Sequence, residues 1–420
     1  MHRAPFESLT DVRVLDLTDR WGQFAGRLLT QLGADVVVAE PPGGHELRTA
    51  WPMVVGPDDT PVSLYFWHFA MGKSSTTWEL DRRPAEAEAL LRAADVVLVG
   101  RGSHRALRER MPDAVSAARV VALSPFGLDA DERPGEDDLH VSAQSGVAGL
   151  SAYSSGETDP DPMPVIPPVE QSMHAAGIYG AIAVMLALRT PRSDGGSLFD
   201  VSAQAAAFQS TEQLFAHWVY RKEELYPRTG GYATSRPSGR WQISASDGMH
   251  TYAFGLLPRT QRSWDALRDW IRREGAIEDL DEPRFAALSA LRGANPYDVS
   301  DAGRHAGEVI TRFLGAVPAD RAYREGQAAG VPWAKVFRPE EVLDEEQFRV
   351  RDLWQPTALS SDGPAFSTQA LPWLRSGPSS AEAGETFVLP RPGEHTAQVA
   401  ARWLSAARTG GRPAGTSSQQ

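Results

Sequence analysis

The stretch with residue types best suited to chemistry is a proline-rich loop that leads into a helix of small residues. Residues 164–202 contain this loop, then a helix expected to begin near Ser172 or Met173, then a short strand. A helix N-terminus presents free N–H groups and the positive end of the helix dipole, so it stabilises carboxylates and acyl oxyanions. A core helix whose start is marked by prolines is the other interpretation, and the pattern alone favours it.

Two further groups of residues have side chains that could take part in catalysis or ligand binding. The run Gly135-Glu136-Asp137-Asp138-Leu139-His140 places two adjacent carboxylates near a histidine, which suits either a solvated turn or a coupled acid/base pair. Lys73 precedes one expected strand and Arg101 follows another. Cations at strand edges can hold phosphates, although solvated surface charges are the alternative.

Several classes of chemistry are excluded by composition. The chain of 420 residues has no cysteine, which removes disulfides, zinc–thiolate sites and thiol nucleophiles. No HExxH, GxSxG, Walker or GxGxxG motif occurs, and the ten histidines are scattered, so no metal is expected. The net charge of −12 argues against nucleic acid as a partner. No apolar run approaches a membrane span, so we expect a cytoplasmic protein without membrane contact.

The elements that must position these residues alternate between strands and helices. A strand at Arg13–Leu17, a helix at Phe24–Leu32 and a strand at Asp35–Ala39 form a βαβ unit, which predicts a parallel, doubly wound α/β sheet. Ligands of such sheets bind beyond the carboxyl ends of the strands, here Asp19–Gln23 and Glu40–Arg48.

The helix that follows the proline-rich loop has two kinds of residue. Its large side chains, Ile178, Ile182, Met185 and Leu186, recur at helical spacing and predict one buried face. Its many alanines and glycines would let another backbone approach closely. Further along, an Asp247-Gly248 turn between two short strand patterns predicts a hairpin in a separate α+β unit.

Short motifs spread over the chain resemble those of the family III CoA-transferases, also called the CaiB/BaiF family, from about Val12 to Leu404. Relatives of this kind include formyl-CoA transferase, carnitine CoA-transferase and 2-methylacyl-CoA racemase. Each motif is short, but their order and spacing are specific. The matching blocks are Val14–Thr18, Leu32–Val37, Glu40–Gly44 with Arg48, Gly72–Ser74 with Leu80-Asp81, Ser124–Gly127, Arg133–Gly135, Asp138 with Gln144–Gly146, Gly195–Ser202, Asp247-Gly248, Gly330–Pro332 with Val336 and Glu341, and Gly393–Thr396.

The resemblance implies a Rossmann-like large domain built from both chain ends, a smaller α+β domain between them, and two ring-like subunits that interlock as a dimer. On this basis we expect residues 1–205 to form the first part of the large domain and residues 206–240 a linker. Residues 241–330 would form the small domain and residues 331–405 a return segment that completes the large domain. Residues 406–420 would be a disordered tail.

The implied reaction is the transfer of CoA between carboxylic acids. In the family an aspartate at the start of the helix attacks the acyl-CoA thioester, which gives an aspartyl anhydride and then an aspartyl-CoA thioester. This chain has Met173 at that position, and methionine cannot form an anhydride. The nearest carboxylate is Glu170, which can substitute only if the loop takes a different route. Asp137 stands where the racemases have their histidine, so racemase chemistry is not supported, although Asp137 remains a candidate acid/base.

The resemblance also implies where CoA binds, with no tightly bound cofactor besides the CoA substrate. The expected CoA-binding residues are Trp21, Gly22, Gln23, Glu40, Arg48, Lys73 and Arg101, with phosphate contacts from Lys73 and Arg101.

Three functions remain open, all with an acyl-CoA and a carboxylic acid as ligands. The first is an active CoA-transferase that uses Glu170 or another acid. The second is a non-catalytic CoA-binding subunit that pairs with an aspartate-bearing paralogue, in place of a homodimer. The third is a family member repurposed for lyase or cyclisation chemistry on a CoA- or carrier-linked acyl group.

Overall fold

The structure is a computed structural model, and by its internal contacts the chain forms two compact units. The first unit comprises Met1–Val147, Pro167–Glu212 and Gln347–Gln420, and the second comprises Ala148–Ile166 and Gln213–Glu346. The residues that the structure describes are 8–56, 59–131, 136–153, 163–166, 168–191, 195–211, 215–223, 225, 242–253, 255–292, 299–359, 365–372 and 387–405.

A six-stranded parallel sheet forms the centre of the first unit. Its order is β10-β7-β6-β1-β2-β5, so the chain starts in the middle, winds outward to β5, and returns to the other side at β6. This confirms the predicted parallel α/β sheet. The strands are β1 (Arg13–Leu17), β2 (Asp35–Glu40), β5 (Ser74–Thr77), β6 (Val96–Val99), β7 (Arg119–Ser124) and β10 (Ser197–Ser202).

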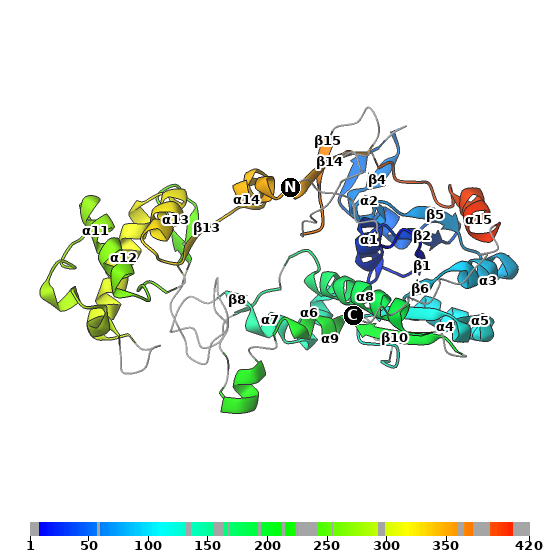
Figure 1. Cartoon of the computed structure of the whole chain (residues 1–420), viewed down its shortest axis with the longest axis horizontal. Coiled ribbons are helices and arrows are strands. Elements are labelled where there is room, and N and C mark those ends of the chain that lie inside the picture. Colours follow the sequence, from blue (N-terminus) through cyan, green and yellow to red (C-terminus); the bar gives the residue numbers. More distant parts are fainter. Residues whose placement is uncertain are drawn as a thin grey trace, which may run out of the picture. The chain divides into compact units, whose positions relative to one another are not determined.

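Helices cover both faces of this sheet because its buried strands are apolar on both sides. Leu15, Val37 and Val97 face one layer of helices, and their neighbours Val14 and Val36 face the other. The first layer has α3 (Pro84–Ala93), α4 (Arg101–Arg110), α5 (Pro112–Ala117) and α15 (Thr396–Leu404); the second has α1 (Gln23–Gln31) and α8 (Gln171–Arg189). Figure 1 shows α15 beside β5 and α3, where the last part of the chain joins the first.

The prediction for the buried face of α8 was wrong. Ile178, Ile182 and Leu186 are about half exposed, whereas the small residues are buried. A Cβ on Gly177 would lie 2.7 Å from the Cβ of Phe24, and one on Gly180 would lie 2.6 Å from Leu123 Cδ2. Because α1 and β7 approach α8 this closely, small side chains fill the contact, and Ile178, Ile182 and Leu186 point outward. Met185, the fourth residue of the predicted face, is partly buried against the core. The close backbone approach that these small residues predict is therefore confirmed.

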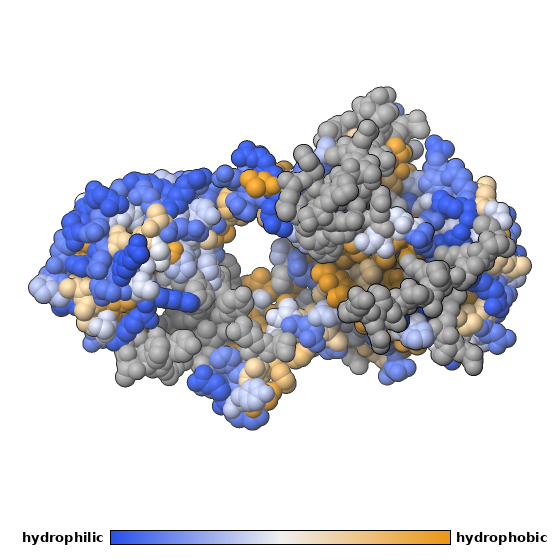
Figure 2. Space-filling model, in the orientation of Figure 1, coloured by the Kyte–Doolittle hydropathy of each residue, from blue (hydrophilic) through white to orange (hydrophobic). Residues whose placement is uncertain are grey.

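Figure 2 shows apolar surface in the part of the molecule where α8 lies in Figure 1. Among the described residues, α8 is the one helix long and apolar enough to cross a membrane. It packs on α1, β7 and β10 in the first unit, which is the arrangement of a core helix.

The second unit contains a three-stranded antiparallel sheet in the order β11-β12-β13. The predicted hairpin turn at Asp247-Gly248 joins β11 to β12, and Gly248 has the positive φ of 75° that this turn needs. The predicted return segment began at residue 331, but β13 pairs with β12 and keeps that stretch in the second unit until residue 346. The bounds are β11 (Gln242–Ser244), β12 (His250–Ala253), β13 (Trp333–Val336), α11 (Gln261–Arg273), α12 (Asp301–Ala316) and α13 (Ala319–Ala328).

The remaining elements are shorter. Residues 226–240 of the predicted linker and the predicted tail, residues 406–420, lie outside the described residues. The other strands are β3 (Met53–Val55), β4 (Pro61–Ser63), β8 (Ala152–Tyr153), β9 (Met163–Pro164), β14 (Trp354–Ala358) and β15 (Ala365–Gln369). The other helices are η1 (Glu46–Thr49), α2 (Leu64–Ala70), α6 (Asp138–Gln144), α7 (Val147–Leu150), α9 (Ala203–Gln209), the π-helix η3 (His217–Arg221), η4 (Pro283–Phe285), η5 (Leu288–Leu291), η6 (Pro339–Asp344) and α14 (Glu346–Val350).

Candidate active site

The sheet reverses its winding direction between β1 and β6, and ligands of doubly wound sheets bind at such a point. The turn after β1 and the N-terminus of α4 meet here. A Cβ on Gly100, the N-cap of α4, would lie 2.7 Å from Asp19 Oδ2. Burial raises the pKa of Asp19 to about 6, although the N–H of Trp21 donates to its Oδ1 at 3.0 Å and opposes the rise. A carboxylate therefore occupies the helix end at which an anion would be stabilised.

Beneath this turn, Lys73 belongs to a buried network. Its Nζ lies 2.9 Å from Asp16 Oδ2 and donates to Gln23 Oε1 at 2.8 Å and to the Gln23 carbonyl at 3.0 Å. The side chains of Lys73 and Asp16 are fully buried. Gln23 passes the contact on, because its Nε2 donates to Thr18 Oγ1 at 3.0 Å. All three ammonium hydrogens have internal acceptors, which argues against a direct phosphate contact by Lys73 and indicates that it holds the β1–α1 turn in place.

Glu40 and Arg48 are bound to each other. Arg48 Nε donates to Glu40 Oε2 at 2.6 Å and its Nη2 donates to Oε1 at 2.7 Å, a bidentate pair. Burial raises the pKa of Glu40, but the hydrogen bonds and charge of Arg48 outweigh it, so the pKa is lowered overall. Arg48 also donates to the carbonyl of Pro390 at 2.8 Å. This pair therefore ties the end of β2 to the returning C-terminal part of the chain.

The other expected CoA-binding residues lie at the same edge of the sheet. Arg101, the first residue of α4, pairs with Glu136 at 2.8 Å and donates to the carbonyl of Gly127 at 3.0 Å. Trp21 is buried, and Gly22 lies so close to Thr18 that a Cβ would be 2.3 Å from its Cγ2. The structure brings these residues to one edge of the sheet, but a phosphate bound by Arg101 must compete with Glu136.

The loop before α8 takes an unusual route. Val169 has φ of 62° and Glu170 has φ of 49°, so the backbone of two consecutive non-glycine residues adopts the left-handed conformation. Such residues cost free energy and persist only where their surroundings hold them. The second of the two, Glu170, is the N-cap of α8.

Two residues hold the Glu170 carboxylate at the start of α8. Arg20 Nη2 lies 2.5 Å from Oε1, and the Tyr65 hydroxyl donates to Oε2. The same hydroxyl lies 3.3 Å from the sulfur of Met173, whose side chain is buried. The Glu170 carboxylate and the Met173 side chain therefore contact one common atom. Burial, together with the hydrogen bond to Glu170, raises the pKa of Tyr65, which keeps this phenol a proton donor to the carboxylate.

A second carboxylate, Asp138 of the acidic run, binds the first turn of α8. Asp138 Oδ1 accepts hydrogen bonds from the Ser172 N–H, at 3.0 Å, and from the Ser172 hydroxyl. Its neighbour Asp137, the candidate acid/base, instead caps α6 by accepting from the N–H of His140 at 3.1 Å and pairs with its ring at 2.6 Å. These bonds lower the pKa of Asp137, which favours a charged cap over a proton donor.

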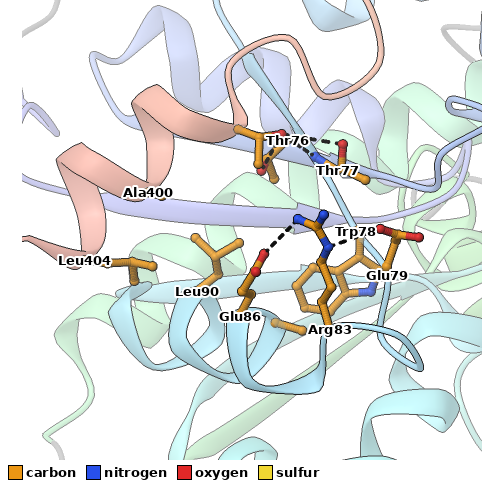
Figure 3. A pocket seen from close by; sticks show the side chains of 11 residues that line it. Thr76, Thr77, Trp78, Glu79, Arg83, Glu86, Leu90, Ala400 and Leu404 are labelled. Atoms are coloured by element: carbon orange, nitrogen blue, oxygen red, sulfur yellow. Dashed lines mark hydrogen bonds and ion pairs between the residues drawn. The ribbon is translucent and has the colours of Figure 1, made fainter.

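A separate pocket lies between β5, α3 and α15 (Figure 3). Its lining includes the threonines Thr76 and Thr77, and Arg83 forms ion pairs with Glu79 and Glu86 there. None of the residues described above lines it. In the part of the chain that the structure describes, no group of three or more acidic or histidine side chains is placed to hold a metal ion.

The sequence pattern of CoA-transferase family III matches residues 9–396. The chain therefore belongs to this family and is an enzyme of acyl-CoA chemistry. It is 24% identical over 402 residues to the succinyl-CoA:(R)-benzylsuccinate CoA-transferase subunit BbsE of Thauera aromatica, with 92% of each chain covered. It is 34% identical over 304 residues to the probable fatty acyl-CoA transferase Rv3272 of Mycobacterium tuberculosis, with 67% of this chain and 72% of the relative covered.

Solved structures agree on the fold. A CaiB/BaiF family protein from Brucella suis superposes with a TM-score of 0.70 at 20% identity, covering 96% of this chain and 100% of the other. Rv3272 superposes with a TM-score of 0.66 at 22% identity, covering 93% and 98%.

Proposed function

We propose that this protein transfers CoA between carboxylic acids with Glu170 as the nucleophilic carboxylate, in place of the aspartate expected at Met173. The observation that carries the proposal is the shared contact of the Glu170 carboxylate and the Met173 sulfur with the Tyr65 hydroxyl. The two left-handed residues before α8 bring the acid to this position. Strain of this kind is common at functional sites.

The environment of Glu170 suits a nucleophile. Arg20 forms an ion pair with its carboxylate at 2.5 Å, and the residue is the N-cap of a 19-residue helix, at the positive end of the helix dipole. Arg20 donates a hydrogen bond to one carboxylate oxygen and Tyr65 donates to the other, so each oxygen keeps a second lone pair for attack. Asp138 fixes the first turn of the helix through Ser172, which limits the freedom of the loop that carries Glu170.

The reaction divides a difficult exchange into easier steps. The Glu170 carboxylate attacks the thioester carbonyl and the C–S bond breaks. The products are free CoA thiolate and a mixed anhydride between the acyl group and Glu170. The thiolate then attacks the Glu170 carbonyl of that anhydride, which releases the first carboxylic acid and forms a glutamyl-CoA thioester. The acceptor carboxylate attacks this thioester, and the same steps in reverse return CoA on the acceptor.

Intact-protein mass spectrometry tests the nucleophile. Wild type, Glu170→Gln and the matched control Glu46→Gln, an exposed carboxylate that contacts the backbone of Arg20, are incubated with a panel of acyl-CoAs and quenched with hydroxylamine or borohydride. We expect an adduct on Glu170 in wild type and in the control, and none in Glu170→Gln. An adduct on another residue, or none in wild type while calorimetry shows CoA binding, would refute the assignment.

A second candidate is a CoA-binding subunit without its own nucleophile. The buried Met173 favours it, and so does the similarity to BbsE, which is named as a subunit of its enzyme. In this case the chain would bind CoA and form no adduct alone, and activity would appear only with an aspartate-bearing paralogue. Lyase or cyclisation chemistry has no comparable support.

Self-association is part of the proposal. The outward stripe of Ile178, Ile182 and Leu186 on α8 is apolar and about half exposed, and an apolar helix face of this kind favours burial against another chain. We expect a homodimer in sizing with light scattering, and a monomer at micromolar concentration would contradict it. CoA is expected to bind at the edge of the sheet that carries Trp21 and Arg101.

A further inference from the structure

His174, in the first turn of α8, bonds to the residue that carries the proposed nucleophile. Its ring Nδ1 lies 3.0 Å from the backbone carbonyl oxygen of Glu170. A carbonyl oxygen only accepts hydrogen bonds, so Nδ1 carries the hydrogen and donates it. Two backbone N–H groups, that of Met173 at 3.1 Å and that of His174 itself at 3.2 Å, donate to the same oxygen. Three donors therefore converge on the carbonyl of Glu170.

The ring of His174 is itself held in place. Its centroid lies 4.8 Å from that of Phe24, in α1, and 5.9 Å from that of Phe69, in α2. The rings of Phe24 and Phe69 also meet each other edge to face, with 6.0 Å between their centroids. Aromatic rings at such separations attract each other, and neighbours on two helices restrict the rotation of the His174 ring. The hydrogen bond from Nδ1 therefore comes from a side chain with little freedom.

This bond acts on a backbone that needs support. Glu170 has φ of 49° and ψ of 57°, and Val169 before it has φ of 62°. In the left-handed conformation the Cβ of an L-residue crowds the following carbonyl oxygen, so surrounding contacts must hold it. A donor that fixes the direction of the Glu170 carbonyl fixes the angle ψ. Because ψ lies between the Cα of Glu170 and the helix, it sets the direction of the Glu170 side chain relative to α8.

The direction of that side chain decides which groups the carboxylate meets. The Tyr65 hydroxyl donates to one carboxylate oxygen, and Arg20 forms an ion pair with the other at 2.5 Å. Tyr65 belongs to α2, and its ring packs on Phe69 with 4.9 Å between centroids. The same helix therefore supports Glu170 in two ways, directly at the carboxylate through Tyr65, and at the carbonyl through the contact of Phe69 with His174.

We propose that His174 is a positioning residue for CoA transfer. Its ring N–H holds the backbone of Glu170 in the left-handed conformation, and this conformation directs the carboxylate to the Tyr65 hydroxyl and Arg20. The inference rests on the proposed function, because the acid that His174 positions is the proposed nucleophile. A nucleophile already held in one orientation gives up little freedom when it attacks, which raises the rate of the chemical step more than the affinity for the substrate.

Three substitutions separate the N–H donor from the ring. His174→Phe keeps a ring against Phe24 and Phe69 but has no N–H. His174→Asn has no ring, but its amide N–H stands where Nδ1 does. His174→Leu has nearly the shape of asparagine without the donor, and it takes the place of His174→Phe in the comparison should that variant not fold. His305→Phe is the matched control, because His305 also stacks on a phenylalanine, at 5.6 Å, and bonds to a residue remote in sequence.

The rate of adduct formation on Glu170 is measured by quenched mass spectrometry as a function of the concentration of acetyl-CoA, succinyl-CoA or palmitoyl-CoA. We expect His174→Phe and His174→Leu to lower the maximum rate by roughly 10- to 100-fold, with the half-saturating concentration changed by less than about twofold. His174→Asn should recover most of the rate, and His305→Phe should match wild type. A wild-type rate in His174→Phe, or equal rates in His174→Asn and His174→Leu, would overturn the inference.

Crystal structures of the variants test the same inference without turnover. We expect the positive φ of Glu170 and its contact with Tyr65 to persist in His174→Asn and to be lost in His174→Phe. Their persistence in His174→Phe would overturn the inference.

The inference and the proposed function fail separately. An adduct on Glu170 that forms at the same rate in wild type and His174→Phe would overturn only the role of His174. The absence of an adduct in wild type, with the Glu170 carboxylate displaced in crystals of His174→Phe and held in those of His174→Asn, would support the hold of His174 on Glu170 and overturn only the nucleophile.

Discussion

Replacing Asp19 with asparagine should stabilise the protein at neutral pH. The pKa of Asp19 rises from 3.8 to about 6 on folding, and each unit corresponds to about 1.4 kcal/mol. The full shift is therefore worth about 3 kcal/mol, and since Asp19 keeps some solvent contact, we expect a gain of about 1–3 kcal/mol in the free energy of unfolding. The asparagine oxygen can still accept the hydrogen bond from the N–H of Trp21.

The pH dependence gives the sign of this effect. Between pH 4 and 6 the folded Asp19 binds more protons than the unfolded one, so its contribution to stability falls as the pH rises through this window. The advantage of Asp19→Asn should be complete at pH 7.5 and close to zero at pH 4. Urea unfolding at several pH values measures it, with Glu109→Gln, an exposed carboxylate of α4, as a control without this trend.

The same substitution should tighten CoA binding at pH 7.5, because it removes a negative charge from the N-terminus of α4. Calorimetry with CoA on wild type and Asp19→Asn measures this. Two results would refute this reasoning: a lower stability of Asp19→Asn at pH 7.5, or an equal effect of the substitution at pH 4 and 7.5. Either result would show that burial of the Asp19 carboxylate does not destabilise the folded protein at neutral pH.

Three further predictions concern α8 and the buried network. Asp138→Asn should weaken the hydrogen bond to Ser172 and reduce the free energy of unfolding by about 1–2 kcal/mol. It should also lower kcat more than it raises KM. An unchanged kcat would show that Asp138 does not position α8 for the reaction. Gly177→Ala should cost about 1–3 kcal/mol because its Cβ meets Phe24, and a neutral result in urea unfolding would contradict the close packing. Lys73→Met should cost about 3–5 kcal/mol by leaving a buried carboxylate unpaired; a large loss of CoA affinity at wild-type stability would instead indicate a phosphate contact.

The sequence predicted the parallel sheet because each strand has a local signature. Arg13–Leu17 and Asp35–Ala39 are short apolar runs separated by one helix, and local spacing is enough to require a crossover. The face of α8 was not predictable in the same way. Ile178, Ile182 and Leu186 form a regular stripe, but the space left by α1 and β7 decides which stripe is buried. A helix in contact with two close neighbours buries its small residues against them. The spacing of large apolar residues in the sequence cannot predict this.

Charge pairing is the other property that the sequence did not show. Motif positions predicted that Lys73, Arg48 and Arg101 would offer positive charge to a ligand. In the structure they form ion pairs with Asp16, Glu40 and Glu136. Asp16 and Glu136 lie far in sequence from Lys73 and Arg101, whereas Glu40 is 8 residues from Arg48. The converse case, Arg27, had a signal that was available. It stands among Ala25, Gly26 and Leu29 on the buried side of α1, and an arginine at a buried helical position requires a counter-ion.

The cations of the first unit differ in their partners: most are paired with carboxylates, and Arg27 is not paired with one among the described residues. The cations at the edge of the sheet hold the β1–α1 turn and the ends of the strands. An incoming anion would have to compete with their carboxylate partners for these cations. Arg20 is bound to Glu170 and holds its carboxylate at the start of α8. Arg27 is buried and lacks such a partner among the described residues.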